Sequence, residues 1–356
     1  MNPLLNHIRY GIHTFSVYMT LTGAEYHAIK HCCVSLRLLC EDYWSKKQSY
    51  YIDIFEDQGL KLYLSHAGKI YTLKIRIEPC RVLYSNDPIA LYQPCKKSYR
   101  KLVKQADKLL SRLSVPCSID DMSICRMDAT TDLYFNCTAF VMHYIRTVQK
   151  GHVLPHYKRV YFKDKPKKAK DPREANRHSY RLECKTAAFF CYDKSAQLAM
   201  TGRLTDDLID THILRLEAEL NRKAIKKFLG HQPDNYSYLK AGYKKAVQII
   251  LWYLKRQMKG MAGTYLRYSA AADAIERQTW REKTKERARY LLRKASDSET
   301  IDAAIHKTCI HFRLKDSAAK RLLSKLEKAG INPITLPNST KIEEMPSLAD
   351  LISDAL

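Results

Sequence analysis

Three segments in the middle of the chain carry carboxylates, a tyrosine and a lysine at every second position. Alternate side chains of a β-strand point to the same face, so each segment would present its polar groups together. The groups on these faces are Arg126, Asp128, Thr130 and Asp132 in the first segment, Tyr192 and Lys194 in the second, and Arg215, Glu217 and Glu219 in the third. If the three strands are neighbours, these groups converge on one surface of a sheet.

Such a surface has the composition of a metal-dependent active site. Clustered carboxylates repel each other unless a cation lies between them, and their oxygen atoms suit Mg²⁺ or Mn²⁺. The ion would polarise a phosphodiester, and with Lys194 it would help a tyrosine, whose ordinary pKa is about 10, to act as a phenolate. The same pattern is also typical of an ordinary outer sheet surface with cross-strand ion pairs, and the residues alone leave both interpretations open.

The surrounding pattern predicts an α+β fold with a central, mainly antiparallel sheet, flanking helices and a helical C-terminal region. Residues 1–120 are expected to be rich in strands and to end in a basic amphipathic helix, and residues 121–230 hold the three polar segments. Helical periodicity dominates 231–345, and the acidic tail 346–356 is expected to fray or to pack back on the chain.

The chain is strongly basic, with 61 Lys and Arg against 37 Asp and Glu among 356 residues and a formal charge of +24. This charge favours a polyanion as partner, and its spread along the chain favours nucleic acid over a single membrane anchor. Residues 158–173 predict a basic loop that either follows DNA phosphates or is simply solvated. The candidate DNA contacts are Lys158, Arg159, Lys163, Lys165, Lys167, Lys168, Lys170, Arg126 and Arg215.

Several classes of protein are disfavoured by what the sequence lacks. It has no P-loop motif of an ATPase or helicase, and no paired-histidine strand motif. Its eleven cysteines include no C-x-x-C pair, which favours reduced thiols over a disulfide framework or a zinc site. We find no apolar run long enough to cross a bilayer and no secretory signal, so we expect a cytoplasmic protein without a membrane partner.

At the three polar segments the sequence resembles the gene II/gene X replication initiators of filamentous phages and related plasmids. The matching motifs are Ile124-Cys-Arg-Met-Asp-Ala-Thr130, Phe190-Cys-Tyr-Asp-Lys194, and Leu214-Arg-Leu-Glu-Ala-Glu219 followed by Lys226-Lys-Phe228. A further match, Ile77-Glu-Pro-Cys-Arg-Val-Leu83, lies upstream, and residues 317–336 look like the family's C-terminal helical region. Order and spacing agree over most of the chain from about residue 70 to residue 230.

This resemblance implies an enzyme that nicks one strand of double-stranded origin DNA in rolling-circle replication and later rejoins the displaced strand. Tyr192 matches the nucleophile, which forms a 5′-phosphotyrosine intermediate and leaves a free 3′ OH, and Lys194 matches a lysine that we assign to stabilising charge on the phosphoryl group. Asp128 and Glu217 match the carboxylates that would hold Mg²⁺ or Mn²⁺. Glu219 and Asp132 are metal candidates by strand face only.

The resemblance also implies partners and leaves alternatives. The partners are the origin duplex, the displaced single strand, and a host helicase and polymerase in the cytoplasm of a bacterial host cell. The family often has an acidic residue five positions after the tyrosine, where this chain has Gln197, so rejoining would use another group. Two alternatives stay open: a conjugative relaxase of similar chemistry, and a non-catalytic DNA-binding protein with a helix-turn-helix near residues 310–330.

Overall fold

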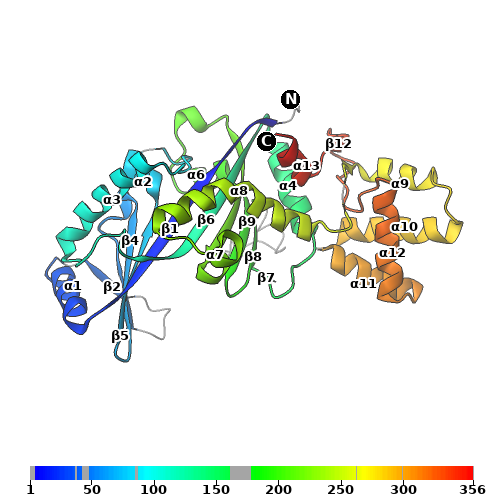
Figure 1. Ribbon diagram of the computed structural model, residues 1–356. Coiled ribbons are helices and arrows are strands. Elements are labelled where there is room, and N and C mark those ends of the chain that lie inside the picture. The colour runs from blue at the N-terminus through cyan, green and yellow to red at the C-terminus, as the bar shows by residue number, and fades with distance from the viewer. Residues whose placement is uncertain are drawn as a thin grey trace.

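A single large sheet forms the centre of the molecule. The computed structural model describes residues 5–36, 38–41, 48–84, 87–160, 178–261, 263–298 and 300–355. Within these residues ten strands form one sheet in the order β2-β3-β4-β5-β1-β6-β10-β9-β8-β7, and each neighbouring pair is antiparallel. The fold is α+β, as predicted, with helices beside the sheet and a helical region toward the C-terminus (Figure 1).

The strands of this sheet are β1 (Leu5–Leu21), β2 (Leu39–Glu41), β3 (Gln48–Ile52), β4 (Leu60–Ala67), β5 (Ile70–Ile77), β6 (Ser123–Phe135), β7 (Lys158–Arg159), β8 (Ser179–Glu183), β9 (Ala187–Asp193) and β10 (His212–Asn221). A separate pair is formed by β11 (Tyr265–Leu266) and β12 (Glu344–Met345). The helices are α1 (Gly23–Ser35), α2 (Pro79–Tyr84), α3 (Lys96–Leu110), α4 (Thr138–Lys150), α6 (Lys194–Met200), α7 (Arg222–Leu229), α8 (Asn235–Gln257), α9 (Tyr268–Glu276), α10 (Glu282–Asp297), α11 (Ile301–Phe312), α12 (Asp316–Lys328) and α13 (Leu348–Asp354).

β1 lies in the middle of the sheet, between β5 and β6. Its second half pairs with β5, and most of its length pairs with β6. The sheet therefore continues from the strands of region 1–120 into those of region 121–230. The three polar segments of the sequence correspond to β6, β9 and β10, whereas no sequence pattern predicted β1.

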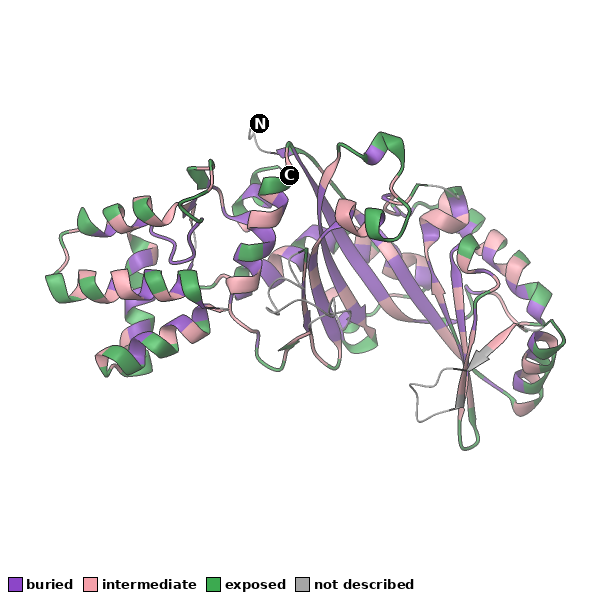
Figure 2. Ribbon diagram, turned by 180° about the vertical axis from the view of Figure 1, so that it is seen from behind, coloured by how far each residue is buried: buried purple, intermediate pink, exposed green. Residues whose placement is uncertain are grey.

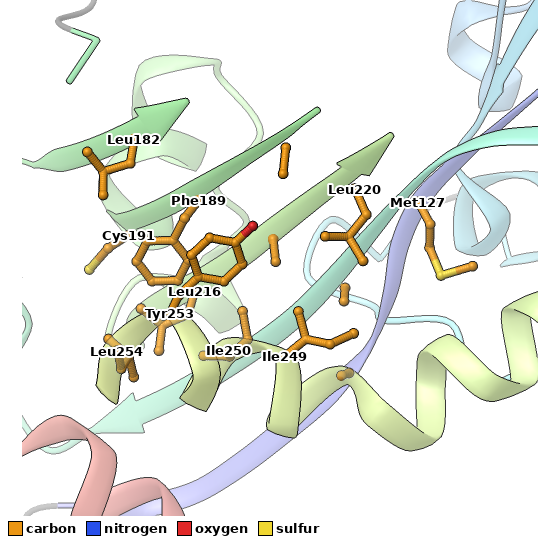
Figure 3. Close-up of a cluster of buried hydrophobic side chains, with 14 of the residues drawn as sticks. Met127, Leu182, Phe189, Cys191, Leu216, Leu220, Ile249, Ile250, Tyr253 and Leu254 are labelled. Atoms are coloured by element: carbon orange, nitrogen blue, oxygen red, sulfur yellow. The ribbon is translucent and has the colours of Figure 1, made fainter. Parts of the chain in front are cut away.

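One face of the sheet is apolar and is covered by α8. Met127 and Ala129 on β6 alternate with the polar positions and are fully buried on this face, together with Leu216 on β10. Figure 3 shows the side chains of α8 that reach this layer, and among them the ring of Tyr253 stacks on Phe189 with 5.1 Å between centroids. Each such buried side chain contributes roughly 1.5–3 kcal/mol to stability.

The close approach of α8 depends on Gly242. A Cβ atom at this position would overlap the Sδ of Met127 and lie 3.3 Å from the Cδ1 of Ile12. Because Gly242 has no side chain, the helix can lie directly on β6 and β1.

The C-terminal part of the chain forms a helical region and then returns to the sheet. Helices α9 to α12 lie at one end of the molecule, whereas α13 lies beside α4 near the sheet (Figure 1). Leu348, Leu351 and Ile352 of α13 are buried, and the Tyr144 hydroxyl of α4 donates to the carbonyl of Pro346 at 3.1 Å. The acidic tail therefore packs back on the chain, one of its two expected arrangements.

One boundary differs from the sequence pattern. Lys194 was expected on a strand, but β9 ends at Asp193, whose side chain accepts a hydrogen bond from the Ala196 amide and caps α6. Lys194 is therefore the first residue of a helix. Among the described residues, no helix has the length and apolar character that crossing a bilayer requires.

We predict that Gly242→Val lowers the free energy of unfolding by on the order of 2 kcal/mol, because the new side chain must displace Met127 within a packed core. Urea denaturation checks this. Gly23→Ala is the control, since a Cβ there meets only Tyr71 at an ordinary 3.6 Å. Equal stability of the two variants would contradict the close packing of α8.

Candidate active site

The three polar strand segments lie side by side on the sheet face opposite α8. β10 pairs with β6 on one side and with β9 on the other, so the condition under which the three polar faces converge is met. Residues directly across from one another form three rows: Asp132, Arg215 and Tyr192; Thr130, Glu217 and Phe190; and Asp128, Glu219 and Ala188. The centre of the sheet is buried along most of the length of its strands (Figure 2).

β1 contributes a fourth set of groups through a β-bulge. Its pairing with β6 shifts register between Ile12 and Phe15, so His13 and Thr14 together oppose the region of Asp128. Thr14 Oγ1 donates to Asp128 Oδ2, and His13 Nδ1 lies 3.5 Å from Glu217 Oε1. The bulge therefore turns both of its own polar side chains, His13 and Thr14, toward the carboxylates.

His13, Asp128 and Glu217 form a compact group of metal-binding side chains. One donor atom from each residue lies within 4.8 Å of the donor atoms of the other two. Among the described residues, this is the single group of three or more His, Cys, Asp or Glu side chains that is so compact. Asp128 and Glu217 are buried, whereas the side chain of His13 is 24% exposed, so the group opens to solvent at His13.

Glu217 also contacts the candidate nucleophile. The Tyr192 hydroxyl donates to Glu217 Oε2 at 3.3 Å, while the other carboxylate oxygen faces His13. A single carboxylate therefore connects the tyrosine to the histidine and aspartate. This contact places the phenolic oxygen at the edge of the group of three donors.

Three of the four carboxylates on this face are bound by arginines. Arg126 donates from Nε and Nη2 to Asp128 at 2.9 and 2.8 Å, and Nη2 also lies 3.0 Å from Glu219. Arg215 and Asp132 form a two-point pair at 2.6 Å, with both side chains fully buried. Glu219 and Asp132, which were metal candidates by strand face, are thus paired with guanidinium groups and lie outside the group of three donors.

Burial and charge shift the pKa values of the key groups. Burial and the negative charge of Glu217 raise the pKa of Tyr192 well above its usual 10. Burial opposes ionisation of Glu217, but the neighbouring His13 and two arginines outweigh it and lower the carboxyl pKa. Burial, with the charge of Arg215, lowers the pKa of Lys194 from 10.5 to about 7. The site therefore holds an ionised carboxylate, a neutral phenol and an amine that titrates near neutral pH.

The residues present fit a divalent cation. Oxygen donors from two carboxylates suit Mg²⁺ or Mn²⁺, and an imidazole nitrogen in the set favours Mn²⁺ over Mg²⁺. This face holds four carboxylates but two guanidinium groups in close contact with them, those of Arg126 and Arg215. The guanidinium group of Arg76 is more distant, at 4.0 Å from Asp128. Arg126 donates to both carboxylate oxygens of Asp128, so it and an added cation compete for this carboxylate.

No protein-family model and no curated protein matches this chain. The likeness to the phage replication initiators therefore rests on the sequence motifs quoted above, and the site is assigned a function from its geometry.

The candidate DNA contacts have different environments. Lys158 is exposed and lies 3.2 Å from Glu183, and Arg159 donates to the carbonyl of Gln149. Arg215 is fully buried and its guanidinium group binds Asp132. A DNA phosphate at the protein surface therefore cannot contact it. The loop candidates Lys163, Lys165, Lys167, Lys168 and Lys170 lie outside the described residues.

His13 is the residue of this group that the sequence analysis missed. Its signal was a break in alternation: Ile12 and Phe15 are both apolar and buried, with two polar residues between them. Two polar residues between inward-facing apolar ones indicate a bulge in a strand, and bulges are frequent next to active sites.

We predict that Arg126→Met binds Mn²⁺ about tenfold more tightly than the natural chain, because it removes a competing positive charge from Asp128. Calorimetric titration measures the affinity. The variant should also be less stable without a divalent cation, since Asp128 then lies buried without its main partner. Arg181→Met, which removes a partner of Glu183 on β8, is the control. Equal Mn²⁺ affinity in both variants would show that Arg126 does not compete.

We predict that Lys194→Met raises the free energy of unfolding at pH 7 by on the order of 2 kcal/mol. This gain in stability over the natural chain should disappear as the pH approaches 10.5. The folded pKa of Lys194 is about 7 against 10.5 when unfolded. Between these values the unfolded chain binds a proton that the folded chain does not, so stability falls as the pH falls and levels off below 7. Urea denaturation from pH 6 to 10 tests this, with the exposed Lys185→Met as control. A benefit independent of pH would contradict it.

Proposed function

We propose that this chain is a metal-dependent DNA nicking and strand-transfer enzyme that initiates rolling-circle replication, with Tyr192 as its nucleophile. The observation that carries the proposal is the contact from Tyr192 to Glu217, because this carboxylate also borders His13 and Asp128. The order of the family-like motifs along the chain adds support, since all three fall on neighbouring strands.

The reaction is a transfer of a phosphoryl group from one oxygen to another. The Tyr192 oxygen attacks phosphorus while the bond to the 3′ oxygen breaks, which leaves a 5′-phosphotyrosine and a free 3′ OH. The phenolic proton leaves Tyr192 for solvent, and the departing 3′ oxygen takes up a proton. Because one phosphodiester replaces another, attack by a 3′ OH reverses the step and rejoins the strand without an external energy source.

His13, Asp128 and Glu217 would hold the cation, which when bound withdraws charge from the phosphodiester and from the phenol. Lys194 supplies a second positive charge, because an incoming phosphate favours the protonated amine. Its Nζ donates to Gln197 at 2.8 Å, so Gln197 serves as an orienting partner at the position where the family often has an acid. Arg215 lies directly across from Tyr192 in the same row, and its pair with Asp132 on the far side fixes the position of its guanidinium group.

The net charge of +24 supports DNA as the substrate class. Origin duplex, displaced strand, host helicase and polymerase, and a location in the cytoplasm of a bacterial cell belong to this proposal. A conjugative relaxase would use the same site and differs in its partners.

A non-catalytic DNA-binding protein is the second candidate, favoured by the arrangement of α11 and α12. These helices are joined by the three residues 313–315, with Arg313 in the left-handed conformation, as in a helix-turn-helix. Such a protein would not depend on Tyr192.

We predict that Tyr192→Phe abolishes covalent attachment to DNA while DNA binding persists. The assay incubates the protein with supercoiled DNA that carries the cognate origin, with and without Mn²⁺, and detects a 5′-phosphotyrosine adduct. His13→Ala and Glu217→Gln should each reduce nicking at least a hundredfold, because each removes a cation-binding side chain. Tyr243→Phe, on the other side of the sheet, should retain activity. An adduct that forms in Tyr192→Phe would refute the assignment and favour another tyrosine.

A further inference from the structure

Helices α7 and α8 carry only positive charge. Their 31 residues include nine Lys or Arg and no Asp or Glu. Most of these cations are exposed, and among the described residues none of the nine forms an ion pair with a carboxylate. We call the following set the α7–α8 basic face: Lys223, Lys226, Lys227, Lys240, Lys244 and Arg256.

Part of this charge works against the stability of the helices. Lys223 and Lys227 are four residues apart on α7, as are Lys240 and Lys244 on α8, and like charges at this spacing repel and weaken a helix. Binding of a polyanion relieves this repulsion, because it neutralises several of the positive charges at once.

The basic face lies on the side of the sheet away from Tyr192. α8 covers the apolar face through Gly242 and Met127, whereas the candidate active site occupies the opposite face. α7 and α8 lie side by side in Figure 1, and buried residues of both belong to the same core. Between Lys240 and Arg256 the helix rises about 24 Å, at about 1.5 Å per residue, which corresponds to about seven base pairs at 3.4 Å each.

The details of the surface distinguish a duplex from a single strand and from a membrane. Binding of a single strand relies on aromatic rings that stack on bases, but the Trp252 ring is flanked by Arg256 at 4.3 Å and Lys227 at 4.9 Å. Binding to an anionic membrane relies on exposed apolar side chains, and none of the large hydrophobic residues that are exposed in the described chain lies on α7 or α8. Lysines that act as point charges on phosphates are typical of duplex binding without sequence readout.

We propose that the α7–α8 basic face binds double-stranded DNA through its phosphates, independently of sequence, on the side of the sheet opposite the candidate active site. The proposal rests on the proposed function only in its choice of DNA as the polyanion. A duplex held there is separate from the strand at Tyr192, so the protein would contact DNA on both faces of one sheet.

The test compares two triple variants with the same change in net charge. One carries Lys226→Glu, Lys240→Glu and Lys244→Glu on the basic face, and the other carries Lys97→Glu, Lys104→Glu and Lys108→Glu on α3, where these lysines are equally exposed. Affinity for a 30-base-pair duplex without origin sequence is measured by fluorescence anisotropy at several salt concentrations. Cleavage of a single-stranded oligonucleotide that carries the origin is measured in parallel.

We expect the basic-face variant to bind duplex at least tenfold more weakly than the α3 variant and to cleave the single strand at the natural rate. Its plot of log affinity against log salt should be less steep by about 2 to 3, as expected for three lost phosphate contacts. Lys→Arg at the same three positions should retain affinity, and Lys→Gln, which introduces no new charge, should show the loss in part.

Equal loss in the two triple variants would overturn the proposal, because it would trace duplex binding to overall charge. Binding of the natural chain to phosphatidylserine vesicles in preference to duplex would overturn it as well. The natural chain and both triple variants could all fail to cleave the oligonucleotide while only the basic-face variant loses duplex affinity. That result would refute the proposed nicking function and leave this proposal standing.

Discussion

The mutual neutralisation of buried charges on one face of the sheet is the constraint on which this molecule depends. Four carboxylates stand on β6 and β10, and taking each of them out of water is costly unless a positive group lies beside it. Arg215 meets this need for Asp132, and Arg126 meets it for Asp128 and Glu219. Glu217 has a histidine and a tyrosine as its near neighbours instead. Among the described residues no arginine lies within ion-pair distance of it, so a cation added there would displace no guanidinium group from Glu217.

The two faces of the central strands have different roles. On one face the alternating apolar residues of β6, β9 and β10 pack against α8 and supply stability. On the other face the same strands hold charged groups in fixed register, because a strand cannot slip by one residue without exchanging its two faces. The rigid apolar layer therefore keeps Tyr192 and Glu217 at hydrogen-bond distance across neighbouring strands.

Much of this arrangement follows from local sequence pattern. Alternation of polar and apolar residues was sufficient to predict β6, β9 and β10 and to place Asp128, Glu217 and Tyr192 on a common face. It did not give β1, because its polar and apolar residues lose their alternation at the bulge, nor did it give the pairing that brings His13 to Glu217 from 204 positions away. The sequence also did not predict the ion pair of Arg215 with Asp132. Alternation places both residues on the polar face, but it does not indicate which cation pairs with which carboxylate.

The central place of β1 has a consequence for how the chain acquires this structure. β1 emerges from the ribosome before any of its partners in the sheet. One of its edges can pair once β5 has been made, but the other stays open until β6 follows more than a hundred residues after β1. Contacts so distant in sequence slow folding, and a 17-residue strand with open edges is prone to pair with the wrong chain meanwhile. The interrupted pattern at His13 and Thr14 lessens this hazard, because a bulge with polar side chains is a poor template for a flat intermolecular sheet. The irregularity that brings a histidine to the carboxylates is thus also one of the features by which strands avoid intermolecular pairing.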